Sequence, residues 1–308
     1  MTLKFGVQHG AGDPNWGPGI LAPTAVAGFA RAAEASGYAA IAFTDHPAPS
    51  TKWIEAGGEG VADPFSALGF CAALTTTMRL LTYVLVPPYR NPFLAAHQVA
   101  TLDVLSDGRV TLGLGTGYLR GEFRALGVEL ETRRRTFDEH LAVMREAWSG
   151  REVTLDTPAF SAPGTHVLPL PVQQPHPPLW IHGNGPWAME RAARDLQGCI
   201  FMVAGAELVR TVRTLPIPDV ETLARRIDEF RTRVVQHGRD PAELDIVVHG
   251  TWPMLDVRKG WSVDERLEHI AALEALGATW VVSTCCGDDP AAAEDTVRAF
   301  GEQVVARV

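Results

Sequence analysis

The stretch LLTYVLVPPYRNPFLAAHQVATLDVLSDGRVTLGLGTG, residues 80–117, contains one full repeat of the pattern that decides the fold. Its two ends, Leu80–Val86 and Val110–Leu114, are apolar at nearly every position, which is typical of strands buried on both faces of a parallel sheet. Between them Asn91 stands before Pro92, and a capping side chain followed by proline predicts the start of a helix. The stretch therefore predicts a strand, a helix and a second strand.

The same alternation continues along the rest of the chain. Helical signals include Asp63 before Pro64 and two apolar stripes at helical spacing, one from Phe137 to Trp148 and one from Leu223 to Val234. The remaining strand-length apolar segments are Leu3–Gln8, Ala40–Thr44, Leu179–His182, Cys199–Met202, Leu244–Thr251 and Thr279–Thr284.

Eight strand–helix units in 308 residues predict a (β/α)8 TIM barrel that forms one domain over residues 1–308. The alternative is a doubly wound open sheet, which normally has a glycine-rich turn after its first strand. Here residues 8–13 read QHGAGD, without the GxGxxG spacing and without a helix that begins on it. The barrel is therefore the favoured fold.

Two segments do not fit a bare barrel. Residues 151–178 contain too many prolines for a helix or a central strand. We expect them to form an insertion between the fourth and fifth strands that covers part of the barrel at the carboxyl ends of the strands. Residues 205–218 form a second stretch that we expect to be a loop.

The charge balance bears on possible partners. The chain has 27 Lys+Arg and 36 Asp+Glu, a formal net charge of −9, whereas nucleic-acid-binding surfaces need clustered basic residues. The one basic run, Arg133–Arg135, lies beside Glu129 and Glu131, and we interpret it as a solvated helix start rather than a phosphate clamp. We expect a small-molecule substrate and no nucleic acid.

Cellular location is inferred from cysteines and apolar segments. The four cysteines form no CxxC pair and are too few for a disulfide framework, which fits a reducing compartment. No apolar run approaches the ~20 residues of a membrane span, and residues 1–8 lack the pattern of a signal peptide. We expect a cytoplasmic protein with no membrane partner.

The sequence motifs of several enzyme classes are absent from this chain. No HxH or HExxH pair is present, so we expect no metal site. The GxSxG nucleophile motif and the GxxxxGK[ST] phosphate loop are missing as well. In a TIM barrel the functional residues follow the strands. The strand ends here carry histidines, aromatic residues and glycines with one carboxylate, Asp45, and this set suits a flat, neutral or anionic ring system.

Three strand ends are the most informative. Asp45 and His46 are adjacent ionisable groups at a buried strand end, where burial is costly unless something compensates it. Residues 183–186, Gly-Asn-Gly-Pro, are either a tight turn or a loop that binds phosphate at a helix start. The glycines of residues 113–117 either relieve crowding or clear space for a ring.

These motifs, taken together, resemble the luciferase-like monooxygenase superfamily and its coenzyme F420-dependent branch. The likeness spans nearly the whole chain and is specific for the superfamily, but less decisive between the deazaflavin F420 and FMN. It rests on Thr44–His46, Ala100–Asp103, Leu105–Arg109, Gly113–Gly117, Glu122-Phe123 before Gly127, and Gly183–Gly185.

The resemblance implies a cofactor whose ring lies at the mouth of a usually dimeric barrel. A non-prolyl cis peptide, here Tyr83–Val84, would press on the ring, and Asp45 would face its polar edge. Gly115, Thr116 and Gly117 would border the ring, and Gly183, Asn184, Gly185 and Pro186 would follow the phosphate-bearing tail.

One departure concerns the substrate. The sugar-phosphate dehydrogenases of this family have a glutamate after the Gly-Thr-Gly, whereas this chain has Tyr118, and lysines are scarce. A phosphosugar substrate is therefore disfavoured. Tyr118 is a candidate general acid, although it could equally form only a wall of the pocket. His46, His9 and His249 compete for the acid role, with His9 and His249 placed as substrate-binding candidates.

Three hypotheses remain open. The first is an F420-dependent oxidoreductase that transfers a hydride to or from a small organic substrate, with His46 assisting at the reacting centre. The second is an FMN-dependent monooxygenase, and the third is a cofactor-binding protein without turnover. The alanine- and leucine-rich segments 63–74 and 92–105 are candidates for a homodimer contact, or for ordinary packing on the barrel.

Overall fold

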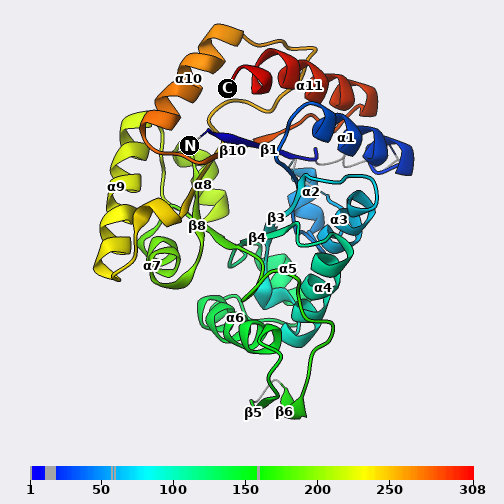
Figure 1. Cartoon of the computed structure of the whole chain (residues 1–308), viewed down its shortest axis with the longest axis vertical. Helices are drawn as coiled ribbons and strands as arrows, with labels where there is room; N and C mark the ends of the chain where they lie inside the picture. The colour runs from blue at the N-terminus through cyan, green and yellow to red at the C-terminus, as the bar shows by residue number, and fades with distance from the viewer. Residues whose placement is uncertain (1, 11–18, 57, 59, 158–159) are drawn as a thin grey trace.

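The computed structural model describes residues 2–10, 19–56, 58, 60–157 and 160–308. Eight parallel strands close into a barrel in the order β1-β10-β9-β8-β7-β4-β3-β2, which confirms the predicted fold (Figure 1). The strands are β1 (Lys4–Gln8), β2 (Ala40–Phe43), β3 (Arg79–Leu85), β4 (Val110–Leu114), β7 (Leu179–His182), β8 (Gly198–Met202), β9 (Asp245–His249) and β10 (Trp280–Thr284).

Helices surround the barrel. Two predicted capping residues act as expected, because Asp63 accepts the backbone N–H of Ser66 and Asn91 accepts the N–H of Phe93. The helices are α1 (Pro23–Ala35), α2 (Thr51–Glu55), α3 (Pro64–Ala72), α4 (Pro92–Leu105), α5 (Arg120–Ala125), α6 (Arg133–Trp148), α7 (Pro186–Asp195), α8 (Ala206–Val212), α9 (Val220–Gln236), α10 (Val263–Ala275) and α11 (Pro290–Gln303).

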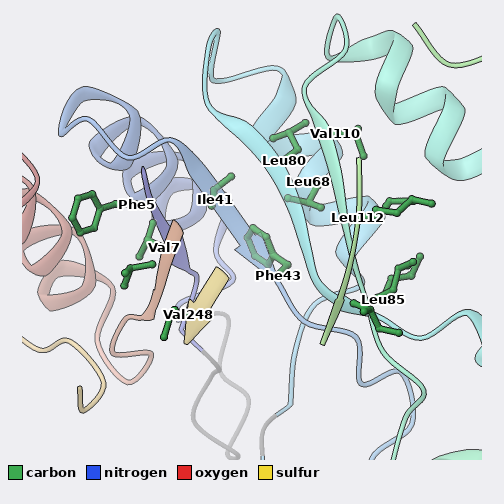
Figure 2. Close-up of a cluster of buried hydrophobic side chains, with 14 of the residues drawn as sticks. Phe5, Val7, Ile41, Phe43, Leu68, Leu80, Leu85, Val110, Leu112 and Val248 are labelled. Carbon is green, nitrogen blue, oxygen red and sulfur yellow. The ribbon is translucent and has the colours of Figure 1, made fainter. Parts of the chain in front are cut away.

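Each strand buries both of its faces. Side chains on the outer faces, among them Phe5, Ile41 and Leu112, pack in the layer between strands and helices (Figure 2). A second cluster fills the barrel interior: Ala40, Ala42, Leu81, Tyr83, Trp180, Ile200, Val247, Trp280 and Val282. Burial on both sides explains why the strand segments are apolar throughout instead of alternating.

The amino end of the barrel is plugged by two tryptophans. The rings of Trp180 and Trp280 meet edge to face, 5.2 Å apart, and both indole N–H groups donate to the Asp245 carboxylate at 3.2 and 3.1 Å. Buried indole groups need such an acceptor. The interior is therefore packed at this end, and space for a ligand is found at the other end.

The expected position of residues 151–178 needs correction. They form a hairpin of β5 (Val153–Asp156) and β6 (Ser161–Thr165), which lies beyond α6 at the bottom of Figure 1. Phe160 packs against Phe93, and Gln173 bonds to Asp103 at 2.7 Å and to the first residue of β4. The returning chain thus crosses the amino ends of the strands, since it must enter β7 there.

The second expected loop also differs. Residues 206–212 form helix α8, and a short bridge joins Ala204, just before this helix, to Ile217 after it. The four cysteines are free and buried. Within the described ranges, the structure has no helix that is both long and apolar enough to cross a membrane.

Candidate active site

A cavity of about 980 Å³ lies at the carboxyl ends of the strands. This volume suits a cofactor-sized ligand. The cavity brings together nearly all of the site residues predicted from the sequence: Asp45, His46, Tyr83, Val84, Gly115, Thr116, Gly117, Tyr118, Gly183, Gly185, Pro186 and His249. His9 and Asn184 are not among its lining residues.

Asp45 lines the cavity, but its carboxylate is occupied by protein groups. Arg90 donates to both oxygens, at 2.7 and 2.9 Å, and the N–H of Val86 donates to Oδ2 at 2.9 Å. Such a two-pronged pair is among the strongest in proteins, and it compensates the burial of both charges. Asp45 therefore fixes the end of β3 against the segment that follows β2.

His46 belongs to a hydrogen-bonded series that ends at the cavity wall. Its Nδ1 lies 3.0 Å from Oε2 of Glu122, and its Nε2 lies 3.3 Å from the Tyr118 hydroxyl. Glu122 is fully buried on the short helix α5. Its Oε2 also accepts the Tyr89 hydroxyl at 2.9 Å, and its Oε1 accepts the N–H of Ala48 at 3.4 Å.

This series sets the tautomer of His46. Burial, together with the negative charge of Glu122, raises the pKa of Tyr89. The Tyr89 hydroxyl therefore stays protonated and donates a hydrogen bond to the carboxylate. With a carboxylate at Nδ1, the neutral imidazole carries its proton there and directs the Nε2 lone pair at Tyr118. His46 and Tyr118 can thus exchange a proton at the cavity wall.

The glycines of β4 relieve crowding with β3. A Cβ on Gly115 would lie 2.6 Å from Cγ2 of Val84, and a Cβ on Gly113 would collide with the carbonyl oxygen of Thr82. The Tyr83–Val84 peptide bond is cis, at the position that the family resemblance implied. Gly115 therefore makes room for Val84, and the Val84 side chain forms part of the cavity wall.

In the Gly-Asn-Gly-Pro turn, one residue holds the turn in place and another leaves space beside it. Gly183 has φ +147°, which favours glycine, and Asn184 is fully buried, bonding to both backbone groups of Met202 and to the Leu215 carbonyl. At Gly185, the first residue before α7, a Cβ would meet nothing within 4 Å. Asn184 thus holds the turn, while Gly185 leaves its edge open to the cavity.

Two histidines and a tyrosine form the deep part of the cavity. Burial, and secondarily the nearby His249, lowers the pKa of His182 to about 4; burial also lowers the pKa of His249. The Nδ1 of His249 donates to the Val282 carbonyl at 3.2 Å, and its ring packs 5.3 Å from that of Tyr83. The side chains of this region are therefore neutral at pH 7.

The family model for luciferase-like monooxygenases matches residues 3–256. This chain belongs to the luciferase-like monooxygenase family. It is 28% identical to an F420-dependent glucose-6-phosphate dehydrogenase of Nakamurella multipartita over 313 residues, which cover 97% of this chain and 87% of the relative.

Solved structures share the luciferase-like fold. Monooxygenase RslO1 from Streptomyces bottropensis superposes with a TM-score of 0.77 at 22% identity, covering 99% of each chain. The F420-dependent tetrahydromethanopterin reductase from Methanopyrus kandleri gives 0.71 at 16% identity, covering 100% of this chain and 99% of that chain. These likenesses concern the barrel itself.

In this luciferase-like barrel, His9 lies away from the cavity. Its ring stacks on Phe43 and meets Phe29 edge to face, each 4.9 Å away, and burial lowers its pKa to about 4. The side chain points outward because neighbouring residues of an extended strand alternate between the two faces. The structure therefore places His9 in the packing layer instead of the substrate site.

Sequence reasoning missed the role of Glu122, which was named only within the family motif. Its contact with His46 joins residues 76 positions apart, so it depends on the fold and no local pattern reveals it. Arg133 and Arg134 do stand at the start of α6, as expected, with Arg133 half-buried and Arg134 exposed, but both also line the cavity, which was not foreseen. Arg135 is exposed, as expected.

Proposed function

We propose that this luciferase-like chain is a cytoplasmic, F420-dependent oxidoreductase that transfers a hydride between the deazaflavin and a small organic substrate. The observation that carries the proposal is the series Glu122–His46–Tyr118 at the wall of a cofactor-sized cavity. The F420-dependent dehydrogenase of Nakamurella multipartita, similar over 97% of this chain, supports it.

The described residues fit a ring with an anionic side arm. The deep end of the cavity is uncharged, and the buried Tyr83 hydroxyl has no hydrogen-bond partner in the described part of the chain. A buried hydroxyl of this kind can donate a hydrogen bond to a ligand acceptor such as a ring heteroatom. At the opposite edge, Gly185 leaves room for close approach of the side arm.

When bound, the deazaflavin supplies the hydride chemistry. The protein has to supply or accept the accompanying proton, because a substrate carbon that gains or loses a hydride changes the proton count of its oxygen or nitrogen. His46 Nε2 and the Tyr118 hydroxyl, 3.3 Å apart, can carry this proton at the cavity wall. Glu122 holds His46 in place and sets its tautomer.

Cofactor choice is tested by fluorescence and absorbance titration of the apoprotein with F420 and with FMN. We expect micromolar or tighter binding of F420 and much weaker binding of FMN. Tight FMN binding with weak F420 binding would instead favour the monooxygenase. Stopped-flow measurement of F420 oxidation or reduction with a panel of alcohols, aldehydes and ketones then tests turnover, and no turnover would indicate a binding protein.

The role of His46 is tested by separating turnover from cofactor binding. In His46→Ala we expect turnover to fall by about 10²-fold or more, while the Kd for F420 changes less than threefold, because the residue serves proton transfer. Tyr118→Phe removes only the hydroxyl and is the matched comparison at the other end of the 3.3 Å contact. Unchanged turnover in His46→Ala would remove this residue from the mechanism.

We also propose a homodimer formed through α3 and α4. Four large apolar side chains on these two helices are exposed, namely Phe70, Leu94, Val104 and Leu105. Large apolar side chains left exposed on neighbouring helices are candidates for burial in an interface. The wild type should therefore be a dimer of 33.3 kDa subunits by light scattering.

Leu105→Glu tests this interface, with Val235→Glu on α9 as the control. The two side chains are similarly exposed, 71% and 62%, so both variants place the same charge on the surface. We expect Leu105→Glu to shift the protein toward monomer and Val235→Glu to remain dimeric. A monomeric wild type, or identical behaviour of the two variants, would contradict the proposed contact.

A further inference from the structure

Three arginines line one wall of the cavity. Arg133 and Arg134 come from the start of α6, and Arg213 comes from the residue that ends α8. This concentration of positive charge stands out in a chain with a formal net charge of −9. Of the cavity-lining residues that the structure describes, Asp45 alone has a carboxylate, and Arg90 already pairs with it.

Among the residues that the structure describes, these three arginines have no acidic partner, as is also true of Arg109 and Arg239, which bond to backbone carbonyls instead. Throughout the described ranges, no carboxylate lies within 4.0 Å of the guanidinium groups of Arg133, Arg134 or Arg213. By contrast, Arg191 pairs with Asp138, Arg233 with Glu190 and Glu229, and Arg258 with Asp256 and Asp288. Glu131, the acidic residue closest in sequence, is held by Arg120 at 2.8 Å.

The three charges act on one another. Burial lowers the pKa of Arg133, and the positive charges of Arg134 and Arg213 lower it further. Its Nε–H is a buried donor with no hydrogen-bond partner in the described structure. Arg133 is half-buried, whereas Arg134 and Arg213 are exposed at the mouth of the cavity. Like charges near one another repel, and an anion that binds between them relieves this repulsion.

The arginines lie near the Gly-Asn-Gly-Pro turn. The guanidinium of Arg134 lies over the Trp187 ring, 5.4 Å from its centre, and Trp187 directly follows Pro186. Arg213 precedes Thr214, whose hydroxyl accepts the N–H of Asn184 at 2.9 Å. Positive charge therefore lies close to the turn that we expect the cofactor side arm to follow.

We propose that Arg133, Arg134 and Arg213 form a binding site for a side arm with several negative charges, and that this site selects F420 over FMN. The inference rests on the proposed function and deepens it. The side arm of F420 carries a phosphodiester followed by glutamate carboxylates, whereas FMN ends in a single phosphate. Three arginines without acidic partners match F420 better than FMN, because each additional anionic group of the F420 side arm can pair with a separate guanidinium.

The test is a fluorescence titration of F420 with Arg134→Gln and Arg213→Gln, at low and high salt. Arg135→Gln is the matched control, because Arg135 is the neighbour of Arg134, pairs with Glu139 at 3.6 Å, and does not line the cavity. All three variants lose one positive charge. We expect about tenfold weaker F420 binding in Arg134→Gln and Arg213→Gln, a smaller salt dependence, and less than twofold change in Arg135→Gln.

A second probe separates this inference from the proposed function. The compound 8-hydroxy-5-deazariboflavin has the deazaflavin ring on an uncharged side chain, so its affinity should be the same in the wild type and all variants. If the wild type binds F420 but Arg134→Gln and Arg213→Gln bind it as tightly, or no more weakly than Arg135→Gln, the arginine site is overturned while the proposed function stands.

Two other results are also decisive. If the wild type binds neither F420 nor the uncharged ring compound, the proposed function fails, and the assignment of the arginines to its side arm fails with it. If the variants keep their F420 affinity but raise the KM of acidic substrates alone, the site binds a substrate anion and the selectivity for F420 is overturned.

Discussion

Glu122 determines the state of two neighbouring side chains through one oxygen. Its Oε2 accepts from the Tyr89 hydroxyl at 2.9 Å and faces His46 Nδ1 at 3.0 Å, in a place without exposure to solvent. A buried carboxylate in such a position fixes the ring orientation and the tautomer of a histidine. Because Glu122 touches His46 and is not itself among the cavity-lining residues, it is a positioning residue.

Glu122→Gln should therefore impair turnover without displacing the cofactor. The amide keeps the shape of the side chain but loses the charge that orients the Nδ1–H of His46. We expect kcat to fall at least about tenfold, with the Kd for F420 within threefold of the wild type. Tyr89→Phe, which removes one hydrogen bond to the same oxygen and no charge, should have a smaller effect. Equal effects in the two variants would indicate loss of packing only.

Gly185→Ala should affect binding and leave the fold intact. A Cβ added at Gly185 would have no atom of the protein within 4 Å, and the φ of −92° allows alanine. Gly205→Ala is a matched control, since Gly205 also precedes a helix, also has an open Cβ position, and does not line the cavity.

Both glycine variants lose the same helix-start preference, about 1 kcal/mol or less, which denaturant unfolding measures. Only Gly185→Ala should weaken F420 binding, by about tenfold, because its methyl group would occupy the space used by the side arm. If both variants bind F420 as the wild type does, the side arm does not pass this turn.

Individual site residues were predictable where the strand rule applied. Asp45, His46 and Tyr118 follow strands directly, so the barrel alone places them at the cavity. The role of each residue was harder to predict, because it depends on partners far away in the sequence. Glu122 is 76 residues from His46, and Arg90 is 45 residues from Asp45. Alternation of side chains along β1 determines that His9 faces the packing layer.

Elements were predicted well where periodicity carries the signal. Every strand of the barrel was expected within a few residues of its observed bounds, since burial on both faces gives each an apolar run. The connections were not predictable in space. Residues 151–178 cross the amino ends of the strands because Gln173 bonds to Asp103 and Arg79, and no local pattern reveals these contacts.

Asn184 joins the turn after β7 to the segment that follows β8, and its replacement should destabilise both segments. Its side chain ties the turn after β7 to Met202 at the end of β8 and to Leu215, with three hydrogen bonds of 2.7–2.8 Å. We expect Asn184→Ala to lower the free energy of unfolding by about 2–4 kcal/mol, because buried backbone groups lose their partners. Urea denaturation measures this loss.

The same substitution should also weaken F420 binding, since Gly183 and Gly185 lose their fixed position. Thr214→Val is the milder comparison, because it removes only the single bond from the Asn184 N–H. A stability loss in Asn184→Ala no greater than in Thr214→Val would show that the turn is held by other contacts.

At the scale of the whole molecule, stability depends on histidines that are buried in their neutral form. Burial lowers the pKa of His9 and of His182 to about 4, below the ordinary value of 6.5. Between these two values the unfolded chain binds protons that the folded protein does not. The free energy of unfolding therefore decreases as the pH falls through this range, and the loss is complete below about pH 4.

His9→Phe isolates one of these contributions without touching the cavity. Phenylalanine has a similar shape and suits a position between Phe29 and Phe43. Because one proton is bound by the unfolded state only, the wild type should lose about 1 kcal/mol more stability per pH unit than His9→Phe between pH 6 and 4.5. Carboxylates contribute equally to both proteins, so the difference in slope from urea unfolding reports His9 alone. Parallel slopes for His9→Phe and the wild type would mean that His9 becomes protonated in the folded protein, at the cost of its packing between the two rings.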